Sequence, residues 1–162
     1  MLTLSKKTDY ALLALSHLMR AGENRAVNTK EIAERFAIPL ELLAKILQRL
    51  ARAKIVVSTP GPTGGYRLAR PPEAISVGAV VQSVDGPPAI AHCFRVDNSG
   101  CEQLTHCTIR GPLERVNARV FHMLNHVSLA EINRDEAPGT VIAIESLSES
   151  RMLQVEMANS LK

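Results

Sequence analysis

The sequence predicts a mainly α fold with a small β-hairpin, arranged as a winged helix-turn-helix domain plus a long dimerisation helix. Three apolar patterns at helical spacing fill the first 52 residues. A β-branched segment with a glycine-rich return follows them directly. Beyond residue 110 a long helical stretch carries an apolar row close to a heptad repeat. These patterns together predict the fold class.

The composition indicates a protein that folds without disulfide bonds. Of its 162 residues, 46% are apolar, which is enough for a hydrophobic core, and its three cysteines cannot all pair within one chain. No leader pattern opens the chain and no apolar run approaches the roughly 18 residues that a membrane span needs. We therefore expect a cytoplasmic protein with no membrane partner.

The charge is unevenly distributed along the chain. Residues 1–70 contain 12 Lys and Arg against 5 Asp and Glu, whereas residues 71–162 contain 7 against 11. A basic N-terminal part joined to a mildly acidic C-terminal part is typical of a nucleic-acid-binding protein with a separate region for sensing or for subunit pairing. Uneven solvated charge without a partner is the alternative explanation.

The first 52 residues carry the pattern of a helix-turn-helix. A helix over 5–21 stops at Gly22, and a short second helix is capped by Asn28 or Thr29. A third helix has Pro39 in its first turn, and only about three residues separate it from the second, as in a sharp turn. Its inner face is apolar and its outer face is basic. The outer residues expected to contact DNA are Lys45, Gln48, Arg49 and Arg52.

A β-hairpin follows the third helix at once. Residues 55–59 form a β-branched strand, 60–65 a tip rich in glycine and proline, and 66–69 a return strand. In such winged-helix arrangements the third helix enters the major groove and the wing reaches the flanking backbone or the minor groove. A phosphate-binding loop is disfavoured because no Lys-Ser/Thr follows the glycines. The wing residues expected to contact DNA are Thr59, Thr63, Tyr66 and Arg67.

The second half of the chain divides into parts of different character. Residues 76–84 predict a short helix, and 92–110 form a long irregular loop. The long helix that follows is expected to pair with a second copy, although an intrachain core helix is the alternative. The predicted divisions are 1–72 for the winged helix-turn-helix, 73–110 for the short helix and cysteine loop, 111–132 for the dimerisation helix, and 133–162 for a tail with a weak helical pattern. The residues expected at the dimer interface are Leu113, Val116, Val120, Leu124 and Val127.

The irregular loop holds Cys93, Cys101 and Cys107, the densest chemistry in the chain. Thiolates are soft ligands that suit iron-sulfur clusters or zinc. Structural zinc sites usually show paired C-x2-C knuckles, which the sequence lacks. A metal-free thiol switch is a further alternative, in which Cys93 or Cys101 forms a disulfide.

The sequence resembles the Rrf-two family of bacterial winged-helix regulators, in its IscR-like and NsrR-like branches, over roughly residues 1–132. The resemblance rests on LSKKTDYA at 4–11, IAERFAIP at 32–39, GPTGGY at 61–66, and the cysteine loop. It implies a homodimer with a [2Fe-2S] or [4Fe-4S] cluster on the three cysteines, just before the dimerisation helix.

The resemblance also bears on the fourth cluster ligand. Seven residues separate the first two cysteines and five the last two, whereas relatives commonly have five in both places. The IscR-like branch has a histidine three residues after the last cysteine, and here that residue is Arg110. The NsrR-like branch implies instead Asp9 of the partner subunit, with His92 and His106 as the alternatives.

The expected function is a homodimeric transcriptional regulator, a repressor, that binds a near-palindromic DNA operator and no small-molecule substrate. Its cluster state is expected to report redox, nitric oxide or iron-sulfur status and to shift the two recognition helices. The alternatives are a thiol-switch regulator of the same fold and an iron-sulfur carrier or assembly partner. An enzyme is not expected, because no nucleophile, base and carboxylate pattern stands out.

Overall fold

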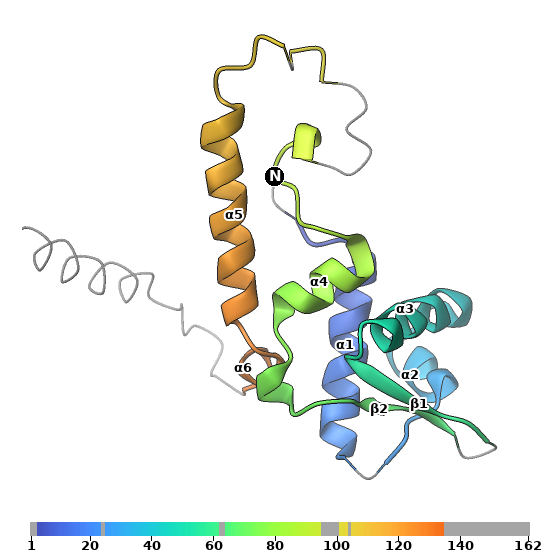
Figure 1. Cartoon of the computed structure of the whole chain (residues 1–162). Helices are drawn as coiled ribbons and strands as arrows, with labels where there is room; N and C mark the ends of the chain where they lie inside the picture. The colour runs from blue at the N-terminus through green and yellow to red at the C-terminus, as the bar shows by residue number, and fades with distance from the viewer. Residues whose placement is uncertain (1–2, 24, 62–63, 95–100, 104, 135–162) are drawn as a thin grey trace, which may run out of the picture.

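The computed structural model describes residues 3–23, 25–61, 64–94, 101–103 and 105–134 (Figure 1). It confirms the predicted mainly α fold with one two-stranded antiparallel hairpin. No helix in the described ranges is long and apolar enough to cross a membrane. Of the predicted tail over 133–162, only Asn133 and Arg134 belong to the described residues.

The helix-turn-helix lies within the first three helices, and side-chain capping explains where the first two of them begin. Their bounds are α1 Lys6–Ala21, α2 Thr29–Phe36 and α3 Leu40–Arg52. The Ser5 side chain accepts a hydrogen bond from the Thr8 amide, and Asn28 caps α2 through the Lys30 amide. Pro39 is the residue before α3 rather than part of its first turn. Ala37 makes the turn between α2 and α3 in the left-handed conformation.

The wing is the hairpin of β1 Val56–Thr59 and β2 Gly65–Leu68. The Val27 and Tyr66 backbones exchange two hydrogen bonds of 2.9 Å, so the segment before α2 pairs with β2. A Cβ on Gly65 would lie 2.2 Å from the Val27 carbonyl oxygen, so only glycine allows this approach. The pairing attaches the wing to the helix-turn-helix.

The core lies where α1, α2 and α3 meet the wing and α4 Val77–Asp85, with the short 3-10 helix η1 Pro72–Ala74 leading into α4. The fully buried large side chains come from nearly every element and include Leu15, Ile32, Leu47, Ile55 and Leu129. Leu129 belongs to α6 Leu129–Ile132, near the end of the described chain. Its burial fixes this late segment to the winged-helix core.

The long helix α5 Arg110–His126 runs beside α4 and extends past it (Figure 1). Val127 and Leu129 pair with the backbone at the start of α4, through hydrogen bonds of 2.8 and 2.7 Å. A Cβ on Gly78 would lie 2.9 Å from the backbone nitrogen of Asn125, so the two helices are in close contact there. None of the side chains of α5 is fully buried. The helix is therefore anchored at its C-terminal end while much of its surface remains open.

Candidate DNA-binding surface and cysteine loop

The outer face of α3 carries the polar side chains expected to contact DNA. Leu43, Ile46, Leu47 and Leu50 point into the core, and Lys45, Gln48 and Arg52 are exposed on the opposite side. Among the described residues, neither Lys45 nor Arg52 forms an ion pair with an acidic side chain. Their charges are therefore available to phosphate groups.

Arg49 differs from the other three side chains of α3 that are expected to contact DNA. Its Nη1 donates a hydrogen bond to the carbonyl oxygen of Val84, in the last turn of α4. The side chain thus ties the third helix to α4 and satisfies a carbonyl that the helix end leaves without an internal partner. The sequence pattern assigned Arg49 to the same DNA-contacting group as Lys45, Gln48 and Arg52, because all four lie between the apolar core positions of the helix.

The wing residues also divide into two groups. Thr59 and Arg67 are exposed, on β1 and β2 respectively. Tyr66 is half-buried and its side chain packs against the core, while its backbone pairs with Val27. Thr63 lies outside the described residues. Of the predicted wing contacts that the structure describes, Thr59 and Arg67 are therefore the exposed ones.

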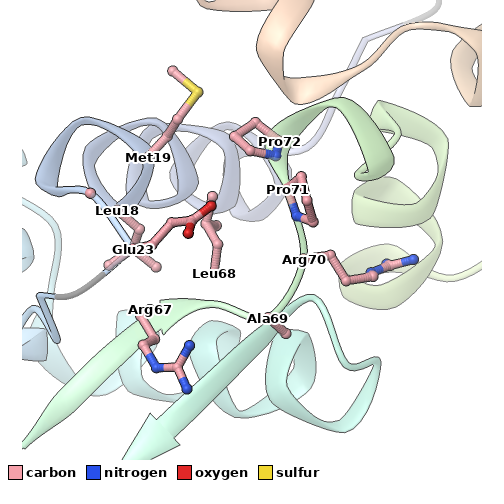
Figure 2. A pocket seen from close by; sticks show the side chains of 10 residues that line it. Leu18, Met19, Glu23, Arg67, Leu68, Ala69, Arg70, Pro71 and Pro72 are labelled. Atoms are coloured by element: carbon pink, nitrogen blue, oxygen red, sulfur yellow. The ribbon is translucent and has the colours of Figure 1, made fainter.

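A hollow of about 420 Å³ lies between the end of α1 and β2 (Figure 2). Its lining is mostly apolar, with Glu23, Arg67 and Arg70 as its charged members. Figure 2 shows both guanidinium groups directed away from Glu23. A small-molecule site usually has polar groups that converge on the ligand, and the charged residues of this lining do not converge.

The cysteines lie in the connection between α4 and α5. Cys93 is in the short 3-10 helix η2 His92–Phe94, and Cys101 and Cys107 lie farther along in irregular backbone next to turns. All three are free thiols and half-buried. Within the described ranges, no three His, Cys, Asp or Glu side chains come together as a metal site. The single chain therefore does not gather the predicted ligands.

The predicted fourth ligand lies on a different element from the cysteines, whereas the alternatives His92 and His106 directly precede Cys93 and Cys107 in the chain. Asp9 is exposed in the first turn of α1, and His106 is exposed in a turn just before Cys107. The side chain of His92 is not among those that the structure describes. An exposed Asp9 is open to a contact with a second chain.

A polar cluster that the sequence patterns did not reveal joins α1 to the end of α4. The side chains of Ser5 and Thr8 donate hydrogen bonds of 2.5 and 2.6 Å to the same carboxylate oxygen of Asp85. Thr8 is 0% exposed and is the buried polar residue of the described core. A signal was present, since an acidic residue at a helix C-terminus opposes the helix dipole. We call Ser5, Thr8, Arg49, Val84 and Asp85 the α4-end cluster.

An apolar row along α5 and its two flanking residues shares four members with the predicted dimer interface, lacks Leu124, and adds Ile109 and Met123. Ile109, Val116 and Met123 are 59%, 46% and 49% exposed and lie seven residues apart. Leu113, Val120 and Val127 are half-buried, alternate with them and complete a heptad seam. Leu124, predicted for this interface, is half-buried and falls outside the seam. We call these six residues the α5 seam.

The three-helix core, the exposed polar face of α3, the hairpin wing and the long outer helix define a winged-helix DNA-binding protein. The family model described as "Rrf2: Iron-dependent Transcriptional regulator" matches residues 4–135. The chain belongs to the Rrf2 family.

Two curated relatives agree with this membership. The HTH-type transcriptional regulator NsrR of Oceanobacillus iheyensis is 28% identical over 83% of this chain and 92% of its own. The HTH-type transcriptional regulator IscR of Sodalis glossinidius is 32% identical over 82% of this chain and 79% of its own. These relatives are regulators and not enzymes, and the chain is likewise a transcriptional regulator.

Solved structures show the same fold. IscR of T. potens has a TM-score of 0.62 and 26% identity, covering 86% of this chain and 92% of that one. CymR, the global cysteine regulator of B. subtilis, also has a TM-score of 0.62, at 24% identity, covering 82% of this chain and 97% of that one.

Proposed function

We propose that this regulator is a homodimeric repressor that binds a near-palindromic operator and senses redox, nitric oxide or iron-sulfur status through a cluster on Cys93, Cys101 and Cys107. The observation that carries the proposal is the placement of three free, half-buried thiols between the winged-helix core and the outer helix. A change in ligation there acts on both neighbouring elements.

The donor set fits an iron-sulfur cluster. Thiolates are the ligands that hold [2Fe-2S] and [4Fe-4S] clusters, and none of the three is consumed in a disulfide. The family description is iron-dependent, and the relatives include NsrR and IscR regulators. Asp9 of the partner subunit is our fourth ligand, because within one chain Asp9 is exposed and the described residues assemble no ligand set.

The α4-end cluster supplies a route from the cysteines to DNA. Asp85 is followed by Gly86 and the segment that leads to Cys93, so a movement of this segment acts on the end of α4. The same end holds Ser5 and Thr8, close to Asp9, and receives Arg49 from the recognition helix. We propose that ligation at Asp9 and at the cysteines shifts α3 through these contacts, which gives the two states different DNA affinities.

Iron and acid-labile sulfide content, with the anaerobic visible spectrum, tests the cluster. We expect the wild-type protein to show charge-transfer bands, and a variant with Cys93, Cys101 and Cys107 all changed to Ala to lose them together with its iron. Asp9→Ala is expected to weaken cluster retention while keeping the fold, because Asp9 is exposed. A wild-type protein that stays colourless after reconstitution contradicts the cluster and favours the thiol switch or zinc.

DNA binding is tested by titration against salt. Lys45→Ala and Arg52→Ala are each expected to reduce the slope of log affinity against log salt by about 1, because each removes one phosphate contact. Gln48→Ala is expected to keep the slope and to relax base preference, since an uncharged amide reads base edges. Arg115→Ala, an exposed cation on α5, is the matched control and should leave the slope unchanged.

Two results of the salt titration separate the rival functions. Wild-type binding that shows no salt dependence contradicts the DNA-binding surface and favours an iron-sulfur carrier. Slopes that stay at the wild-type value in both Lys45→Ala and Arg52→Ala contradict the assignment of α3 as the recognition helix.

A further inference from the structure

The C-terminal half of α5 carries a pair of histidines that the proposed function does not use. His122 and His126 lie one helical turn apart and both are exposed. Their ring centroids are 4.1 Å apart, with 32° between the ring planes. Two imidazoles on one face of a helix at this spacing can reach the same metal ion.

The orientation of His126 is suited to ligation. Its Nδ1 lies 2.8 Å from the carbonyl oxygen of His122, and because a carbonyl only accepts, Nδ1 carries the proton. In the neutral ring the Nε2 lone pair is then free. Histidines that bind metals almost always donate the other ring N–H to such an oxygen, which fixes the ring and its tautomer.

The surroundings of the pair also favour a cation. His126 is the last residue of α5, where unpaired carbonyl groups give the helix end a partial negative charge. At 100° per residue the pair lies on a different side of α5 from the α5 seam and from Asn117, Phe121 and Asn125. Arg119, the nearest cation on this side, lies one helical turn before His122 and two turns before His126, the residue at the helix end. Dimerisation through the seam therefore leaves the pair open.

We propose that His122 and His126 form a two-histidine site for a borderline divalent metal ion such as Ni²⁺, Cu²⁺ or Zn²⁺, with one ion per chain and water in the remaining positions. Imidazole nitrogen is the donor that these ions share. The site is distinct from the cysteine loop. That loop ends where α5 begins, at Arg110, and the helix rises by about 18 Å between Arg110 and His122.

An Ni²⁺ titration followed through the ring-proton NMR signals of the five histidines tests the site. We expect the His122 and His126 signals of the wild-type protein to broaden together as one equivalent is added. Binding by the cysteine loop alone would broaden His92 and His106 first and would overturn the proposal. His126→Gln is expected to weaken Ni²⁺ binding at His122 on the order of 100-fold, because one chelating partner is lost.

Two further variants control for helix position and for folding. His106→Gln removes an exposed histidine near the cysteines and should leave broadening at the pair unchanged. Ala118→His in the His126→Gln protein creates a new pair, at 118 and 122, and should restore binding. If His126→Gln leaves the His122 response at the wild-type concentration, or if the new pair restores nothing, the two-histidine site is wrong.

Discussion

Changing Val116 and Met123 together to Glu is expected to convert the protein to a monomer and to lower its affinity for a palindromic operator about 1000-fold. Both side chains are roughly half exposed in the single chain, at 46% and 49%, so a folded monomer accommodates the charges. In a dimer paired through the α5 seam the same carboxylates are buried against apolar side chains without a partner. Light scattering after size exclusion measures the mass, and fluorescence anisotropy measures DNA binding.

The control for this prediction lies on the same helix. Ala118 is exposed on the side of α5 opposite the seam, so Ala118→Glu adds a charge without touching the proposed interface. It should keep the dimer mass and the operator affinity. A Val116→Glu, Met123→Glu protein that remains dimeric with full affinity contradicts pairing through the α5 seam.

Asp85→Ala is expected to reduce the free energy of unfolding by about 3 kcal/mol. The change removes two hydrogen bonds to a charged group and leaves the hydroxyl of Thr8, which is 0% exposed, without its acceptor. A buried hydroxyl without a partner carries its full desolvation cost. Urea denaturation followed by circular dichroism gives the value.

A double-mutant cycle separates the α4-end cluster from a general effect of lost charge. Thr8→Val with Asp85→Ala should cost less than the sum of the single changes, because both remove the same contact. Glu73→Ala, which removes an exposed carboxylate from η1, should change stability by less than about 0.5 kcal/mol. Additive effects at Thr8 and Asp85 would show that their hydrogen bond contributes nothing.

Much of the fold was predictable because the information is local. Alternating core and surface residues defined α3, Ser5 and Gly22 marked the ends of α1, and the β-branched run with its glycines defined the wing. The cysteine loop was predictable from composition, since three thiols and no regular periodicity stand between two helical patterns. The predicted boundaries differ from the observed ones by about one residue at most of these elements.

The α5 seam was predictable only in part. Leu113, Val116, Val120 and Val127 repeat at helical spacing, but Leu124 and Met123 are adjacent apolar residues and the periodicity accepts either. In the single chain Met123 is exposed and Leu124 is half-buried, which is why we propose Met123 for the seam. The sequence pattern assigned Ile109 to the cysteine loop. Its place in the α5 seam becomes clear only from the structure, in which α5 begins at Arg110, directly after Ile109.

The sequence by itself determined the elements, their order, the polar face of α3 and the three thiols, because each depends on neighbouring residues and on helical or strand periodicity. Only the tertiary structure decided what Arg49 and Asp85 do. Asp85 meets Ser5 and Thr8 across 80 and 77 residues, and Arg49 meets Val84 across 35. Contacts over such separations form when packing brings distant segments together, and no local pattern specifies them.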